Sequence, residues 1–237
     1  MIRKLCFFLF LSLTTAAHPG HTRRQGQNVR NLQSPPPQEL MQLSETPRIY
    51  LFKGFLSDDE CHHIIQVAQP HLIASKVIDE QNQGEKKDPR RSSQGFFIPN
   101  HWNDSILKSI EQRIASVTGL PMENGENLHV LHYSVGGEYQ PHYDYFNPST
   151  PGGAECLSRG GQRVASFIMY LNTPEAGGAT IFPRAHIQVT PVRGDAILFY
   201  NCTPNGMVDP ESFHGGAPVI AGEKWIMTKW IRERVFR

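Results

Sequence analysis

The hydrophobic pattern divides the chain into an N-terminal part with helical periodicity and a C-terminal part of short apolar runs. The segment DDECHHIIQVA follows Ser57, a favourable N-cap residue, and its apolar positions share one face, which predicts an amphipathic helix. A second helix is predicted from Asp104 to Thr118, ended by Gly119. Just before the first helix, the run IYLFKGFL alternates in the manner of a strand.

After Glu126 the apolar positions form short runs rich in Val, Ile, Tyr and Phe, separated by Gly and Pro. The eight runs are LHVLHY, EYQPHYDYF, RVASFIMYL, ATIFP, IQVTPV, AILFY, APVI and KWIMTKWI. Strands of this length and number predict a β-sandwich or jelly roll with the helices packed outside it, and so an α+β fold. The Gly-, Pro- and Ser-rich stretch 147–161 is expected to be an exposed loop.

The first 17 residues, MIRKLCFFLFLSLTTAA, have a basic start, an apolar run and small residues at the end, which is typical of a signal peptide. We therefore expect a secreted, periplasmic or secretory-lumen protein. An uncleaved anchor is the alternative, but the run is shorter than the roughly 20 apolar residues that a span requires. Residues 18–47 are polar and contain three consecutive prolines, which predicts a flexible leader before one domain at 48–237.

Composition fits a folded domain and gives no sign of a nucleic-acid partner. The chain has 237 residues, 39% of them hydrophobic, and a formal net charge of +1, so no excess of basic residues is available to bind phosphates. Outside the expected signal peptide, Cys61, Cys156 and Cys202 have no CxxC or zinc-finger spacing, and their disulfide pairing stays open.

Candidate metal ligands lie in the second half of the chain. His142 and Asp144 are two apart in EYQPHYDYF, and on a strand both would point to the same face. In a chain with 11 histidines such a pair is weak evidence alone. His214 in SFHGGAPV comes far enough along for intervening strands to return beside the pair. Two histidines and one carboxylate can hold Fe(II) on one face, although the same set also suits a zinc hydrolase.

Lys224 separates these two possibilities. It begins the run KWIMTKWI, where alternation places it on one face with Ile226, Thr228 and Trp230. A lysine at the edge of an apolar interior is costly if unpaired, so it requires an anion. The distal carboxylate of 2-oxoglutarate would be such an anion, whereas a zinc hydrolase offers none. The same lysine, together with a complete triad, argues against a catalytically inactive binding module.

Taken together, these motifs resemble the catalytic domain of prolyl 4-hydroxylases, close in layout to plant, algal and bacterial members, from about Ile49 to Arg232. The resemblance implies a double-stranded β-helix with supporting N-terminal helices. It also implies a dioxygenase that uses Fe(II), O2 and 2-oxoglutarate, with ascorbate, to hydroxylate proline residues and release succinate and CO2. Hydroxylation of free amino acids, lysyl residues or another small molecule stays open. The motifs are HYDYF at 142–146, GGATIFP at 177–183, GDAILFY at 194–200 and DPESFHGGAPVIAGEKWIMTKWIRE at 209–233.

The resemblance also assigns roles. His142, Asp144 and His214 would be the iron ligands and, with Lys224, the catalytic set. Tyr133 and Thr180 would help Lys224 hold the 2-oxoglutarate carboxylate. Aromatic faces would receive proline rings and charged groups would bind peptide carbonyls and amides. The implied groove residues are Arg91, Ser93, Glu126, Tyr139, Arg163 and Trp230.

Two positions depart from the family pattern. Ala217 stands where many plant members have a cysteine, which loosens any disulfide inference. His132 stands where an arginine usually precedes the tyrosine, which predicts altered cosubstrate or groove contacts. The other histidines, among them His129, are expected to be satisfied structural residues. The chain lacks the separate peptide-binding domain of animal collagen prolyl hydroxylase subunits, so we expect a free-standing enzyme.

Overall fold

The structure, a computed structural model, describes residues 39–237, so the expected signal peptide and residues 18–38 of the expected leader lie outside the described residues. Strand β1 (Glu39–Glu45) pairs antiparallel with β2 (Arg48–Lys53). The predicted boundary at residue 48 is therefore wrong, and the folded part begins by Glu39. Most side chains of β1 are exposed, so main-chain pairing holds the strand and no apolar period reveals it. In the described part of the chain, no helix is long and apolar enough to span a membrane.

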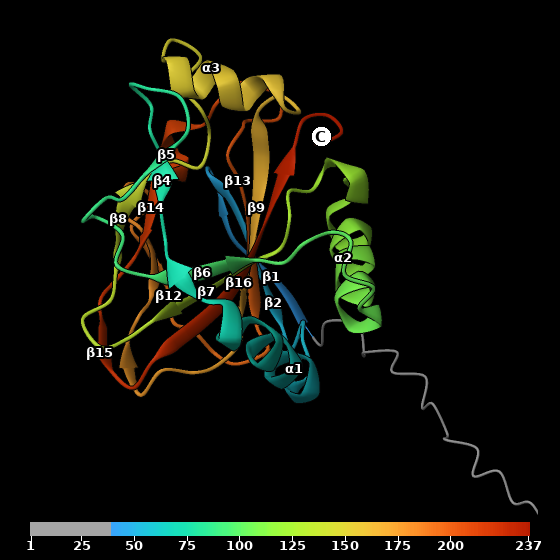
Figure 1. The fold of residues 1–237 in the computed structure, drawn as a ribbon, viewed down its shortest axis with the longest axis vertical. Coiled ribbons are helices and arrows are strands. Elements are labelled where there is room, and N and C mark those ends of the chain that lie inside the picture. Colours follow the sequence, from blue (N-terminus) through green and yellow to red (C-terminus); the bar gives the residue numbers. More distant parts are fainter. Residues whose placement is uncertain (1–38) are drawn as a thin grey trace, which may run out of the picture. The chain divides into compact units, whose positions relative to one another are not determined.

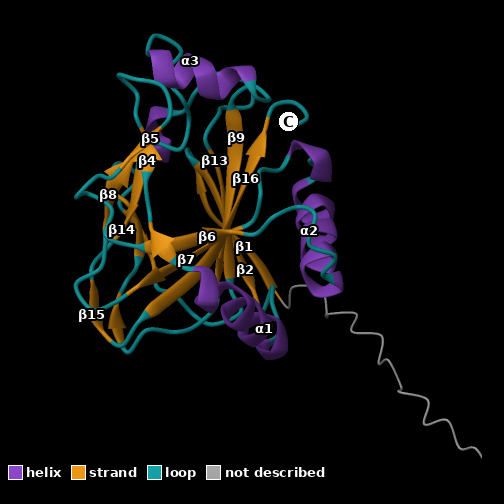
Figure 2. Cartoon of the chain, viewed as in Figure 1, coloured by secondary structure: helices purple, strands orange, loops and turns teal. Residues whose placement is uncertain are grey.

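Two antiparallel sheets form the predicted jelly roll, and Figures 1 and 2 show the smaller sheet beside one face of the larger. In the larger sheet the order is β1, β2, β13, β9, β16, β7, β6 and β3, and in the smaller it is β12, β11, β14 and β8. The further strands of the larger sheet are β13 (Ala196–Tyr200), β9 (Arg163–Tyr170), β16 (Lys224–Arg232), β7 (His129–Tyr133), β6 (Gln94–Phe97) and β3 (Ile73–Ala74). Those of the smaller sheet are β12 (Ile187–Val189), β11 (Thr180–Phe182), β14 (His214–Gly216) and β8 (Tyr139–His142).

Both predicted helices are confirmed, with the caps that the sequence indicated. Helix α1 (Asp58–Ala68) begins at a capping box in which Ser57 and Glu60 bond each other's backbone N–H. Helix α2 (Ser105–Thr118) is capped by the carboxylate of Asp104 and ends at Gly119, whose φ of 67° favours glycine. In Figure 1 both helices lie on the side of the larger sheet away from the smaller sheet.

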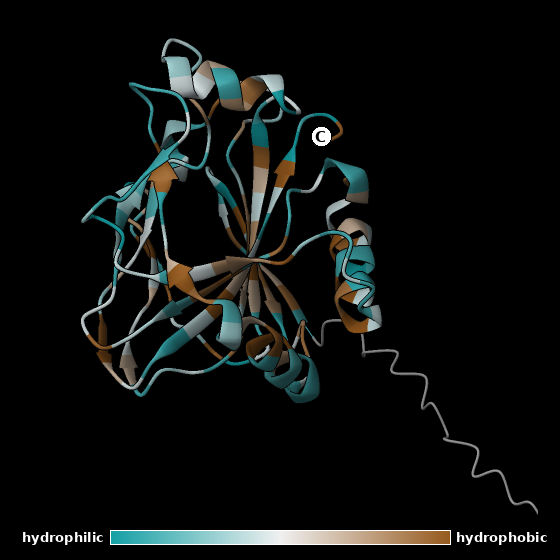
Figure 3. Ribbon diagram, in the orientation of Figure 1, coloured by the Kyte–Doolittle hydropathy of each residue, from teal (hydrophilic) through white to brown (hydrophobic). Residues whose placement is uncertain are grey.

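The core consequently has two layers, one on each face of the larger sheet. Trp225 and Met227 of β16 pack with the buried side chains of α1 and α2, whereas Ile226 packs with the smaller sheet. The alternation predicted for KWIMTKWI is therefore confirmed, and it explains why every residue of β16 is buried. Figure 3 shows hydrophobic residues along these strands and on the helices, with hydrophilic residues in most loops.

All eight predicted runs contain a strand, but the predicted loop at 147–161 is wrong. Helix α3 (Pro151–Ser158) occupies its centre, capped by the hydroxyl of Thr150, which accepts from the backbone N–H of Gly153. Gly153 permits close packing here, because an added Cβ would lie 1.9 Å from the carbonyl oxygen of Asn147. The glycine that suggested a loop is therefore needed for the close packing of α3 against the backbone of Asn147.

The three cysteines in the described part of the chain, Cys61, Cys156 and Cys202, are free thiols.

The remaining elements are short. The short strands pair as β4 (Val77–Ile78) with β5 (Glu85–Lys86) and as β10 (Ala176–Gly177) with β15 (Val219–Ala221), and the 3-10 turns are Gln69–His71, Met122–Asn124 and Pro210–Ser212.

Candidate active site

The three predicted metal ligands converge between adjacent strands. His142 ends β8 and His214 begins β14, and the two are register partners in the antiparallel pair. Asp144 lies beyond the end of β8, so the expectation that it shares a strand with His142 is wrong. A bend after the strand nevertheless brings the carboxylate back, with Oδ1 3.6 Å from Nε2 of His142 and Oδ2 3.6 Å from Nε2 of His214. The three ligand atoms lie within 4.8 Å of one another.

Backbone carbonyls orient both imidazoles. Nδ1 of His142 lies 2.9 Å from the carbonyl oxygen of Gln140, and Nδ1 of His214 lies 2.9 Å from that of Ser212. A carbonyl oxygen only accepts, so each Nδ1 carries a proton and each ring turns its Nε2 toward Asp144, the orientation of a metal-ligating histidine. Burial lowers the pKa of His214 to about 4, which keeps that ring neutral.

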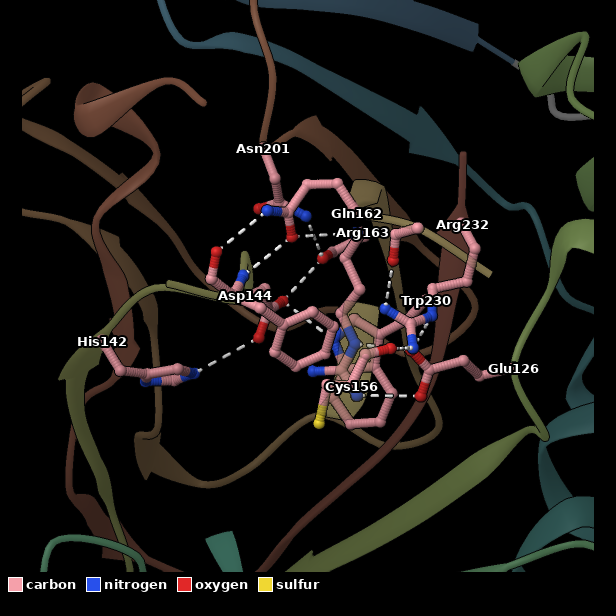
Figure 4. A network of polar contacts seen from close by, with 12 residues as sticks. Glu126, His142, Asp144, Cys156, Gln162, Arg163, Asn201, Trp230 and Arg232 are labelled. Atoms are coloured by element: carbon pink, nitrogen blue, oxygen red, sulfur yellow. Dashed lines mark hydrogen bonds and ion pairs between the residues drawn. The ribbon is translucent and has the colours of Figure 1, made fainter. Parts of the chain in front are cut away.

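Asp144 lies within the network of polar contacts drawn in Figure 4, and the hydrogen bonds from Ser166 and Trp230 both reach the same carboxylate oxygen. Oδ2 accepts hydrogen bonds from Ser166 Oγ at 2.6 Å and from Trp230 Nε1 at 2.9 Å. The amide of Asn201 donates to Ser166 Oγ at 3.0 Å, which directs the serine hydroxyl proton to Asp144. Burial raises the pKa of Asp144, but the hydrogen bonds and positive charges around it, that of Arg163 among them, outweigh burial and hold the pKa well below its usual range. The carboxylate is ionised, with Oδ1 facing His142.

This donor set fits a divalent iron ion. Two imidazole nitrogens and one carboxylate oxygen on a common side are the donors of the facial triad that binds Fe(II) and leaves further positions open. The hydrogen bonds to the far side of each ligand are those that fix ligand orientation in metal sites. His142, Asp144 and His214 would therefore hold the metal, as the sequence predicted.

Lys224 is a buried cation without a hydrogen-bond or ion-pair partner among the described residues. It is 3% exposed, and no hydrogen bond or ion pair joins it to another residue of the described chain. Its Nζ lies 5.5 Å from the centre of the Tyr133 ring, its register partner on β7. Nζ also lies 3.6 Å from where a Cβ on Gly216 would stand, so the glycine leaves room around the ammonium. Burial lowers the pKa of Lys224 to about 8.

The other two predicted cosubstrate residues lie nearby and are buried. Tyr133 is beside Lys224, and Thr180 is the register partner of Gly216. Thr180 accepts a hydrogen bond from the hydroxyl of Tyr170 at 2.8 Å. Burial raises the pKa of both tyrosines, so both hydroxyls are neutral. The sequence did not indicate Tyr170, because an aromatic residue in the run RVASFIMYL is expected to belong to the core.

A cavity of about 1110 Å³ opens beside the triad and includes His142 and Asp144 in its wall. Four of the predicted groove residues, Arg91, Tyr139, Arg163 and Trp230, also line it. Tyr139 stacks on His142 with ring centres 3.6 Å apart, and the guanidinium of Arg163 lies 4.0 Å from the centre of the Trp230 ring. The wall is thus rich in flat rings and positive charge.

The structure places the other two predicted groove residues behind this wall. Ser93 Oγ accepts a hydrogen bond from Arg91 Nε at 3.2 Å. The buried carboxylate of Glu126 accepts from Arg163 Nε at 2.6 Å and from Arg163 Nη2 at 2.8 Å. Neither Ser93 nor Glu126 is part of the cavity wall. Each instead binds an arginine of that wall, Ser93 binding Arg91 and Glu126 binding Arg163.

His132, the departure from the family pattern, points away from the site. Its Nε2 lies 2.8 Å from Oε2 of Glu223, and its ring lies 4.4 Å from that of Trp225. It lines no part of the cavity. The prediction that this substitution alters groove contacts is therefore wrong, because alternation along β7 turns His132 to the face opposite Tyr133.

Comparison with known proteins agrees with this geometry. The family model of the 2OG-Fe(II) oxygenase superfamily matches residues 128–232. Probable prolyl 4-hydroxylase 6 of Arabidopsis thaliana is 42% identical over 219 residues, covering 84% of this chain and 74% of the relative. Prolyl 4-hydroxylase 5 of the same plant is 39% identical, covering 82% and 72%. The viral collagen prolyl hydroxylase of Paramecium Bursaria Chlorella virus-1, solved as a 2OG complex, superposes with a TM-score of 0.61 at 27% identity, covering 78% of this chain and 95% of that one.

Proposed function

The chain belongs to the prolyl 4-hydroxylases and is an Fe(II)- and 2-oxoglutarate-dependent dioxygenase, and we propose that it hydroxylates proline residues within an extended peptide or protein segment. Family membership excludes the zinc hydrolase. Bound Fe(II) supplies, with O2, the oxidative decarboxylation of 2-oxoglutarate to succinate and CO2 that drives the hydroxylation. His142, Asp144 and His214 would hold the ion.

The unpartnered ammonium of Lys224 is the observation that carries the cosubstrate assignment. It lies in a buried corner with Tyr133, while the neighbouring Thr180 and Tyr170 supply hydroxyl groups. A carboxylate there would gain a charge-assisted hydrogen bond to Lys224 and would remove the cost of the unpaired cation. We therefore place the distal carboxylate of 2-oxoglutarate at Lys224, with Tyr133 and Thr180 as its further donors.

The cavity favours a peptide over a small substrate. Its volume of about 1110 Å³ is above the range of roughly 300–1,000 Å³ typical of small-molecule sites. Tyr139 and Trp230 offer flat faces on which proline rings pack, and Arg91 and Arg163 offer donors for peptide carbonyls. A free amino acid would leave most of this wall uncovered.

The activity is tested with Fe(II)-loaded protein, ascorbate and 2-oxoglutarate. Succinate formation should accelerate when a proline-rich peptide is added, and mass spectrometry should locate one added oxygen on a proline residue. Absence of stimulation across collagen-like and polyproline peptides would show that the substrate is not a peptidyl proline. Oxygen on a lysyl residue or a free amino acid would support the corresponding alternative.

Ascorbate and location belong to the same proposal. Ascorbate would sustain turnover as the reductant, so its omission should shorten the linear phase of succinate formation. The N-terminal pattern of residues 1–17 supports export or entry into a secretory lumen. N-terminal sequencing of the mature protein tests this, because a signal peptide predicts a new terminus near His18.

A further inference from the structure

His129 is a buried histidine on the cavity wall, and its ring nitrogens have no hydrogen-bond partner among the described residues. It begins β7, is 4% exposed and lines the cavity beside the triad. Its Nδ1 is fully buried and has no hydrogen-bond partner among the described residues, whereas Nε2, which lies over Gly95, also has no partner there but is not fully buried. The expectation that His129 is a satisfied structural residue is therefore wrong.

The surroundings of His129 are suited to a ring of its shape. Phe97 stacks on it with ring centres 3.7 Å apart and planes 12° apart, and the Trp230 ring centre lies 5.6 Å away. Gly95 admits the ring, because an added Cβ there would lie 2.5 Å from Nε2 of His129. An apolar ring could fill the same space without leaving a buried nitrogen unsatisfied. Folding alone therefore does not account for an imidazole at this position.

The imidazole is neutral. Burial, followed by the positive charges of Arg91 and Arg163, holds the pKa of His129 well below its usual range. A neutral imidazole carries one N–H donor and one acceptor nitrogen. Both arginines also line the cavity. Their positive charges would repel a protonated His129 ring but not a neutral ring that donates one N–H.

The three rings of Phe97, His129 and Trp230 form one continuous part of the cavity wall, which we call the aromatic wall. Trp230 connects it to the metal site, since the same side chain donates to Asp144. Phe97 is 43% exposed, so its ring presents apolar surface to the cavity. A segment bound against the aromatic wall would therefore lie directly beside the reacting centre.

We propose that His129 is a specificity-determining residue whose imidazole Nε2–H binds a main-chain carbonyl of the proline-containing segment packed on Phe97 and Trp230. The inference rests on the proposed function. A proline-rich segment lacks N–H groups at its prolines and so presents more acceptors than donors. A neutral donor inside a wall of rings matches that chemistry, because the rings receive the pyrrolidines and the imidazole receives a carbonyl between them.

His129→Phe tests the role, because phenylalanine keeps an aromatic ring in the stack and removes the donor. We expect kcat/KM for a proline-rich peptide to fall about tenfold through KM, the effect of losing roughly one hydrogen bond. The KM for 2-oxoglutarate and the rate of peptide-independent succinate formation should not change, and Tm should stay or rise. His129→Gln keeps a side-chain N–H and should recover part of the peptide affinity.

His132→Phe is the matched control. His132 lies on the same strand and also contacts a tryptophan ring, but it faces away from the cavity. Its substitution should leave the peptide kcat/KM unchanged. A second measurement uses the wild-type protein, in which the imidazole ¹⁵N resonances of His129 should shift when a proline-rich peptide is added and not when a glycine-serine peptide is added.

The outcomes separate this inference from the proposed function. If the wild-type protein hydroxylates prolines while His129→Phe keeps the wild-type peptide kcat/KM, or if the ¹⁵N resonances do not shift, the inference is wrong and the proposed function stands. If the wild-type protein hydroxylates no proline-containing peptide, the proposed function is wrong and the inference falls with it.

Discussion

Two buried lysines on one strand of this protein have opposite surroundings. Lys224 and Lys229 both belong to β16 and are 3% and 4% exposed. Lys229 faces the helical layer and forms an ion pair with Glu111 of α2. Lys224 faces the smaller sheet and has no hydrogen-bond or ion-pair partner in the described chain. Burial of a lysine alone therefore does not indicate a ligand site. A buried lysine for which the fold supplies no anion does indicate one.

The largest effect is expected from disrupting the ion pair between Lys229 and Glu111. Lys229→Met leaves the carboxylate of Glu111 without its cation, and removing one partner of a buried pair costs about 3 kcal/mol. Urea denaturation should show this loss in the free energy of unfolding. The KM for 2-oxoglutarate should stay at the wild-type value, and an unchanged stability would mean that the pair with Glu111 contributes nothing.

Lys224→Met should behave in the opposite way. It removes an unpaired buried cation, so the free energy of unfolding should not fall. The KM for 2-oxoglutarate should rise roughly 10- to 150-fold, the equivalent of a charge-assisted contact worth ~1.5–3 kcal/mol. Steady-state kinetics with varied cosubstrate measures this, and an unchanged KM would disprove the role assigned to Lys224.

The metal ligands resemble Lys229, because the chain supplies partners for their outer atoms. Ser166→Ala removes a donor to Oδ2 of Asp144 and should weaken metal binding about 10- to 100-fold. Calorimetric titration with Fe(II) or Co(II) measures the affinity directly. Ser158→Ala, at an exposed serine of α3, is the control, and equal affinities in the two variants would show that Ser166 does not position the carboxylate.

The smallest effect is a pH dependence specific to Lys224. Burial lowers its pKa to about 8, so the ammonium is present below that pH and is lost as the pH rises through it. The charged form binds the carboxylate, and 2-oxoglutarate affinity should therefore fall about tenfold per pH unit above pH 8. In Lys224→Arg the side chain stays charged, so a pH profile that keeps the same slope would contradict this reading.

The sequence predicted what depends on local patterns. Helix caps at Ser57 and Asp104, the eight strand runs and the two faces of β16 all follow from residues close together in the chain. It did not predict that Ser166 and Asn201 support Asp144, because that network depends on which distant strands pair. The only signal was a serine inside a buried apolar run. His129 was missed for the same reason, since its lack of a partner is visible only once the whole cavity wall is assembled.

The support of Asp144 also has a mechanical consequence. His142 and His214 belong to the smaller sheet, whereas the two donors that hold Asp144, Ser166 and Trp230, belong to the larger. An ion shared by the three ligands would therefore link one sheet to the other. Chelation of the ion would remove this link between the sheets as well as the reactive centre. The edge strand β8, which ends at His142, would then be the first place for a protease to cut.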